Sequence, residues 1–219
     1  MQQNINFVNI DDPRLGIVLY KTGLRPTLAK ELDNLLTTGS KGRVWQTAKV
    51  GYGDIPDPSY RKCWDCKITQ HHVVNEPELL AIYNEYAQLV RACVDHYASS
   101  RRAKMEYMEA INFVKYGPGE HFAAHADDGF SYSATISTVG YLNDDYLGGE
   151  LDFPTLGIRL KPETGDIITF PSSFIYQHAS LPVAAGTKFS AVTMFDWNDK
   201  WHQYHGPSNP KPPTFHPTA

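Results

Sequence analysis

The chain has 219 residues, 42% of them hydrophobic, which is enough to enclose one good-sized core but short for two full domains. Charged residues make up 20% and the formal net charge is −4, which argues against nucleic acid or an anionic membrane as a partner. The sequence has no signal-peptide pattern, no apolar run of membrane-spanning length, and too few cysteines for a disulfide framework, so we expect a cytoplasmic protein.

Two amphipathic helices are predicted in the first half of the chain. Four leucines recur at helical intervals after Pro26, and Gly39 ends that run. A longer run of apolar residues at three- and four-residue steps extends from about Glu76 to Tyr97. We expect the second helix to bury one long face against a sheet.

After Lys104 the chain consists of short runs rich in β-branched and aromatic residues, separated by turn residues. The predicted strands are 109–116, 134–142, 150–153, 158–160, 166–170 and 189–195. Many short strands of this kind are typical of a sandwich or barrel, with the helices on one outer face. The tail from Trp201 onward has five prolines and no apolar periodicity, which predicts an irregular extension.

A metal site is predicted from three residues. His125 and Asp127 are two positions apart, so on an extended segment both side chains project to the same face. His178, which follows a predicted strand, is the candidate for the third ligand. Two imidazoles and one carboxylate on one face of an octahedron leave three positions open, the arrangement used by non-haem Fe(II) oxygenases.

Two nearby residues strengthen this prediction. Lys188 begins a predicted strand, and a buried ammonium there would need a carboxylate partner, such as one end of a dicarboxylic acid. Tyr116 ends an apolar strand, and its hydroxyl needs a hydrogen-bond partner if it is enclosed.

Other groups in the chain also suggest metal or redox chemistry. His121 and His125 are four apart, as in a helical zinc pair, but Phe122 stands where the metalloprotease pattern needs glutamate. Cys63 and Cys66 form a C-x-x-C that could bind zinc or undergo redox exchange. No second C-x-x-C occurs, so two ordinary thiols, still able to oxidise in vitro, are the favoured interpretation. The tail histidines are expected to be exposed; they are His202, His205 and His216.

Residues 109–197 resemble the catalytic domain of the prolyl 4-hydroxylase-like branch of the 2-oxoglutarate oxygenases. The matching segments, in the order and spacing of that family, are VKYGPGEHFAAHAD, STVGYLNDDYLGGELDFP, GDIITFPSSFIYQH and GTKFSAVTMFDW. The resemblance implies a double-stranded β-helix, or jelly roll, with the N-terminal helices packed on its larger sheet. It implies iron(II) held by His125, Asp127 and His178, with 2-oxoglutarate as cosubstrate, dioxygen as oxidant and ascorbate as a further candidate cofactor.

The same resemblance assigns a cosubstrate pocket. It implies that Lys188 pairs with the distal carboxylate of 2-oxoglutarate, that Tyr116 hydrogen-bonds this cosubstrate, and that Tyr141 lines the pocket. Because lysine lacks the bidentate fork of arginine, neighbouring hydroxyls should complete the cage. Thr135, Ser137 and Tyr141 share strand parity and are the candidates. In the family, the region equivalent to 51–62 covers the substrate, although a plain surface loop fits the sequence equally well.

These inferences predict one oxygenase domain over residues 1–200, with helical support in 1–104, a catalytic jelly roll in 105–200 and a Pro-rich tail in 201–219. The implied activity is hydroxylation of an unactivated C–H bond with release of succinate and carbon dioxide. Peptidyl proline is the leading substrate, so a peptide or protein partner is expected. The alternatives are the same chemistry on a free amino acid, another protein residue or an alkylated nucleic-acid base, and a non-catalytic jelly-roll binding module.

Overall fold

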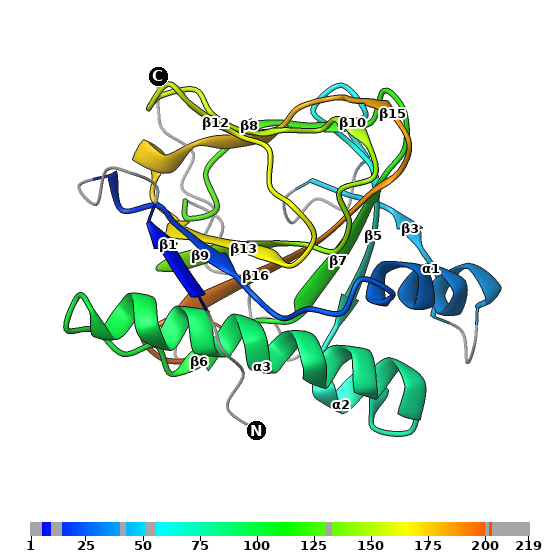
Figure 1. Ribbon diagram of the computed structural model, residues 1–219, viewed down its shortest axis with the longest axis horizontal. Helices are drawn as coiled ribbons and strands as arrows, with labels where there is room; N and C mark the ends of the chain where they lie inside the picture. The colour runs from blue at the N-terminus through cyan, green and yellow to red at the C-terminus, as the bar shows by residue number, and fades with distance from the viewer. Residues whose placement is uncertain are drawn as a thin grey trace, which may run out of the picture.

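Two antiparallel β-sheets face each other, and helices cover the outer side of the larger one (Figure 1). The computed structural model describes residues 6–9, 15–39, 43–50, 56–129, 133–199 and 202, with the backbone alone for 6–9. Within these residues the larger sheet has nine strands, in the order β1 (Asn6–Asn9), β2 (Val18–Lys21), β13 (Asp166–Pro171), β9 (Ile136–Tyr141), β16 (Lys188–Asp196), β7 (Ile111–Tyr116), β5 (Trp64–Ile68) and β3 (Gln46–Thr47), with β6 (Tyr107–Met108) on β16.

The smaller sheet closes the other side of the molecule. Its five strands follow the order β12 (Ile158–Leu160), β11 (Leu151–Phe153), β14 (His178–Ser180), β8 (His121–His125) and β4 (Arg61–Lys62). A separate short pair joins β10 (Leu147–Gly148) to β15 (Val183–Ala185), and a 3-10 turn spans Phe174–Tyr176. The expected jelly roll is therefore confirmed: most of the chain is β, arranged as two facing antiparallel sheets.

The two predicted helices, after Pro26 and from about Glu76, are present, and a third, short helix is not predicted. They are α1 (Leu28–Thr38), α2 (Gln70–Val73) and α3 (Pro77–Ser99), and α3 runs along the outer face of the larger sheet (Figure 1). The Tyr86 hydroxyl of α3 donates a hydrogen bond to the Ala191 carbonyl of β16 at 2.9 Å. A side chain at Gly140 of β9 would clash with the Tyr86 ring, so glycine permits this close approach. Strand β9 is buried along its whole length because α3 lies on one side of it and the smaller sheet on the other.

The six predicted strands are all present and end within two residues of their expected bounds. Strands β1–β5 before residue 105, and the short strands β6, β8, β10, β14 and β15, are not predicted. Strand β8 reads HFAAH, a composition with little β-propensity, and its pairing with β14 and β4 stabilises it instead. No helix within the described ranges has the length and apolar composition needed to cross a membrane.

The prediction that His202 is exposed is wrong. Its side chain is only 6% exposed, its Nε2 lies 3.2 Å from Asp196 Oδ2, and its ring stacks on Tyr107 with centroids 3.9 Å apart. The other tail positions, including His205 and His216, lie outside the described residues.

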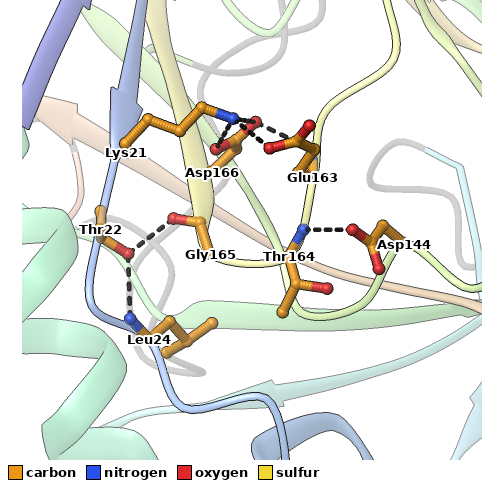
Figure 2. Close-up of polar contacts among 8 residues, drawn as sticks. All are labelled: Lys21, Thr22, Leu24, Asp144, Glu163, Thr164, Gly165 and Asp166. Carbon is orange, nitrogen blue, oxygen red and sulfur yellow. Dashed lines mark hydrogen bonds and ion pairs between the residues drawn. The ribbon is translucent and has the colours of Figure 1, made fainter.

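A polar cluster joins β2 to the start of β13 (Figure 2). Lys21 Nζ donates to Asp166 Oδ2 at 3.0 Å and to Glu163 Oε2 at 2.7 Å. Asp166 is 1% exposed and also accepts the backbone N–H of Glu163 at 2.8 Å. The adjacent Gly165 has φ +87° and donates its N–H to the Tyr141 carbonyl at 2.8 Å. The cluster therefore fixes the turn that supports the end of β9.

We expect Asp166→Ala to lower the free energy of unfolding by about 2 kcal/mol, because a buried amide and an ammonium lose their acceptor. Urea denaturation followed by tryptophan fluorescence measures this change. The matched control is Glu163→Gln, since the Glu163 side chain is 72% exposed and should contribute less than about 0.5 kcal/mol. Equal losses for the two variants would contradict a structural role for the buried carboxylate.

Candidate metal and cosubstrate site

A cavity of about 570 Å³ lies between the two sheets. Its lining includes all six predicted site residues: His125, Asp127, His178, Tyr116, Tyr141 and Lys188. The first three come from the smaller sheet and the segment after it, and the other three from adjacent strands of the larger sheet. Residues remote in sequence therefore meet in one cavity.

His125, Asp127 and His178 converge on one point. His125 ends β8 and His178 begins β14, and the two residues are direct partners in the antiparallel pairing. Asp127 follows two positions after β8, and one ligand atom from each residue lies within 4.8 Å of the others. Asp127 Oδ1 is 3.5 Å from Nε2 of His125, and its Oδ2 is 3.6 Å from Nε2 of His178.

Both imidazoles are oriented for ligation through Nε2. His125 Nδ1 lies 2.9 Å from the Ala123 carbonyl and His178 Nδ1 lies 3.2 Å from the Tyr176 carbonyl, so we assign the proton to Nδ1 in each ring. Burial lowers the pKa of His178 to about 4, which leaves that imidazole neutral at neutral pH. Asp127 Oδ2 is buried without a hydrogen-bond partner among the described atoms. The donor set therefore fits a divalent metal ion of intermediate hardness.

Aromatic packing holds the first of these imidazoles in place. The Phe122 ring stacks on His125 with centroids 3.7 Å apart. The Arg61 guanidinium carbon lies 4.7 Å from the Phe122 ring centroid, and Arg61 donates to Asp65 Oδ2 at 3.0 Å. Tyr60 and Arg61, from the end of the 51–62 region, also line the cavity, while residues 51–55 lie outside the described part of the chain.

Lys188 supplies a buried cation at the start of β16. The residue is 2% exposed, and its Nζ donates to the Gly149 carbonyl at 2.8 Å and to Ser180 Oγ at 2.7 Å. No carboxylate of the described residues forms an ion pair with it. Burial, followed by the charge of Lys161, lowers the pKa of Lys188 to about 7. An anionic ligand would supply the missing partner and favour the charged form.

Two tyrosines flank this lysine. Tyr116 pairs directly with Lys188 across β7 and β16, and Tyr141 pairs with Ser190 on the other side of β16. Their ring centroids lie 5.1 and 5.2 Å from Lys188 Nζ. The Tyr141 hydroxyl is buried and lacks a hydrogen-bond partner among the described atoms, so it is available to a bound ligand.

Of the three hydroxyls expected around Lys188, Tyr141 lies beside it, but the prediction is wrong for Thr135 and Ser137. Thr135 Oγ1 donates to Asp196 Oδ1 at 2.6 Å, and Ser137 Oγ pairs with Ser172 Oγ at 2.8 Å. Ser180 and the Gly149 carbonyl contact Lys188 instead. Ser180 follows His178 by two positions on β14, so the same-face rule that links His125 to Asp127 would have identified it.

The two cysteines of the C-x-x-C point to different environments. Cys63 packs with Tyr116 and Val183, whereas Cys66 packs against the core beneath the helices. All three cysteines of the chain are free. Residues three apart on an extended chain project to opposite faces about 10 Å apart, too far for a disulfide. A disulfide between Cys63 and Cys66 therefore does not fit the folded protein, and their oxidation in vitro stays a prediction.

Comparisons with known proteins agree with this geometry. The sequence profile of the 2OG-Fe(II) oxygenase superfamily matches residues 111–196, which include all six site residues. A prolyl 4-hydroxylase-like protein of Acanthamoeba polyphaga mimivirus is 22% identical over 218 aligned positions, covering 89% of this chain and 80% of that protein.

Solved structures share the fold. The viral collagen prolyl hydroxylase of Paramecium Bursaria Chlorella virus-1, solved as its 2OG complex, matches with a TM-score of 0.61 and 19% identity over 82% of this chain and 95% of that one. A prolyl hydroxylase of Trichoplax adhaerens, solved with a hypoxia inducible factor peptide fragment, matches with a TM-score of 0.68 and 14% identity over 89% of each chain.

The chain therefore carries a 2OG-Fe(II) oxygenase domain on a jelly-roll fold. Within that class the chain is similar to prolyl 4-hydroxylases in sequence and in fold.

Proposed function

We propose that this oxygenase hydroxylates a peptidyl proline and releases succinate and carbon dioxide. His125, Asp127 and His178 are the proposed ligands of iron(II). The observation that carries the proposal is that this trio and an unpaired buried lysine line the same cavity. Similarity to prolyl 4-hydroxylases supports proline as the hydroxylated residue and a peptide or protein as the partner.

Lys188, Tyr116 and Tyr141 are the proposed residues for 2-oxoglutarate. The ammonium would neutralise the distal carboxylate, while the two phenol groups donate hydrogen bonds to the same ligand. Apolar side chains of Val139 and Leu151 line the cavity beside them and limit access of water. Bound iron(II), together with 2-oxoglutarate and dioxygen, supplies the oxidising power for the C–H bond.

We also propose one domain over residues 1–200, because β2 and β5 from the N-terminal half are hydrogen-bonded into the larger sheet. A reducing compartment such as the cytoplasm suits the three free cysteines. Ascorbate is included in the assays below as the reductant for iron.

Mass spectrometry of proline-rich peptides incubated with iron(II), 2-oxoglutarate and ascorbate tests the proposal. A gain of 16 Da on proline, matched by an equal amount of succinate, is expected. Formaldehyde release from methylated oligonucleotides, with unmodified peptides, would favour a nucleic-acid substrate instead. An anaerobic titration without a metal-to-ligand charge-transfer band would point to a non-catalytic binding module.

The affinity for 2-oxoglutarate should depend on pH through Lys188. The pKa of this lysine is about 7, so the cation needed for a dicarboxylate is progressively lost above that pH. We expect the apparent Kd to rise about tenfold per pH unit above pH 7. The folded pKa is below the ordinary value of 10.5, so the unfolded chain holds more protons between these values. Stability without cosubstrate should therefore rise with pH across this window.

Anaerobic binding titrations between pH 6.5 and 9 measure this dependence. Lys188→Arg keeps its charge throughout the range and should give a flat profile, whatever its absolute affinity. A flat profile for the unmodified protein would show that another group binds the distal carboxylate.

A further inference from the structure

The chain's own Pro-rich tail begins beside the proposed active site. Asp196, the last residue of β16, is 4% exposed. It accepts hydrogen bonds from Ser133 Oγ at 3.0 Å and from the Trp197 backbone N–H at 2.8 Å. His202 is held against the same carboxylate and against Tyr107. The position from which residues 203–219 depart is therefore fixed at the end of β16.

The cavity extends along β16 almost to that position. Alternate residues of the strand line it: Lys188, Ser190, Val192 and Met194. Met194 is two residues from Asp196, a separation of about 7 Å along a strand. Glu109, whose backbone N–H donates to the Met194 carbonyl at 2.9 Å, lines the same end.

The metal trio lies toward this end of the cavity. Asp127 interacts with the Ser137 side chain, and Ser137 pairs with Met194 across β9 and β16. Lys188, at the opposite end of β16, marks the proposed position of the cosubstrate. A peptide that approaches from the side of Asp196 would therefore meet the metal site before the cosubstrate pocket.

The tail has the composition and length to reach this site. Residues 203–219 contain five prolines: Pro207, Pro210, Pro212, Pro213 and Pro217. At no more than about 3.6 Å per residue, a chain of five residues, as from His202 to Pro207, can span roughly 18 Å, and one of eight, as from His202 to Pro210, roughly 29 Å. The chain between His202 and the prolines from Pro210 onward is therefore long enough for these prolines to reach back along the cavity. A short tether of this kind supplies an effective concentration on the order of millimolar.

We propose that this oxygenase hydroxylates prolines in its own residues 203–219 in an intramolecular reaction, an inference that rests on the proposed function. One oxygen atom of dioxygen enters a proline C–H bond and gives a C–OH group. The other oxygen atom enters 2-oxoglutarate, which loses a carboxyl group as carbon dioxide and leaves as succinate. The expected sites are the prolines from Pro210 onward.

The test uses the full chain with iron(II), 2-oxoglutarate and ascorbate under air, followed by peptide mapping. Residues 203–219 should gain 16 Da for each hydroxylated proline, or 18 Da under ¹⁸O₂. The fraction of chains modified per unit time should not depend on protein concentration. In an equimolar mixture with ¹⁵N-labelled Asp127→Ala chain, only the unlabelled chain should be modified. Equal modification of both chains would overturn the intramolecular reaction.

A control variant separates this inference from the proposed function. Replacement of the five tail prolines by alanine should abolish the mass gain there, and the variant should still hydroxylate an added proline-rich peptide. An unmodified tail together with a hydroxylated added peptide would overturn the inference alone. If neither the tail nor any peptide is hydroxylated and no succinate forms, the proposed function fails as well.

Discussion

Asp127→Ala is expected to abolish 2-oxoglutarate turnover, because the variant removes the only carboxylate of the proposed ligand set. Two imidazoles remain, and they satisfy neither the charge nor the geometry of a three-ligand iron(II) site. Metal affinity should fall by more than the roughly 10- to 100-fold that loss of an outer hydrogen-bond partner costs. Anaerobic iron(II) titration measures the affinity, and succinate formation measures the turnover.

Asp152→Ala is the matched control for this variant. Asp152 lies on β11 of the same smaller sheet, but its carboxylate accepts a hydrogen bond from Arg159 at 2.8 Å and does not line the cavity. Its turnover should match that of the unmodified protein. Removal of metal by a chelator should stop turnover, and added iron(II) should restore it. Full activity of the Asp127→Ala protein would reject the ligand assignment.

Lys188→Met is expected to weaken 2-oxoglutarate binding while leaving iron(II) binding intact. Loss of one partner of a buried, hydrogen-bonded charge pair costs about 2–5 kcal/mol, or roughly 30- to 4,000-fold in Kd. The methionine stem fills similar space, so the change removes the charge with little change in packing. Varied 2-oxoglutarate in steady-state kinetics should show a raised cosubstrate requirement and a smaller change at saturation.

Stability and a second lysine provide the controls for this prediction. Without cosubstrate, Lys188→Met should be as stable as the unmodified protein or more stable, because the buried lysine has no carboxylate partner in the described structure. Lys161→Met removes a nearby exposed cation, whose Nζ donates to the Gly148 carbonyl at 2.6 Å, and should change Kd by less than about fivefold. A Kd unchanged by Lys188→Met would exclude Lys188 from the cosubstrate site.

Local patterns in the sequence were sufficient for the elements with strong periodicity. Helix α3 follows from apolar residues at three- and four-residue steps, and Gly39, with φ +70°, ends α1 as its position predicts. The longer strands of the core have enough β-branched and aromatic residues to be identified alone. Strands such as β8 were missed because their stability comes from pairing with segments far away in the chain.

The sequence by itself determined which side chains are candidates for the chemistry, because H-x-D on an extended segment and a later histidine and lysine are recognisable without coordinates. Only the tertiary structure decided their surroundings. The pairing of β8 with β14 brings His125 beside His178, and the register of β16 with β7 places Tyr116 beside Lys188. Packing between distant segments also brings Thr135 to Asp196, gives Lys188 its contact with Ser180, and stacks His202 on Tyr107. Such contacts depend on three-dimensional packing between segments that no local pattern connects.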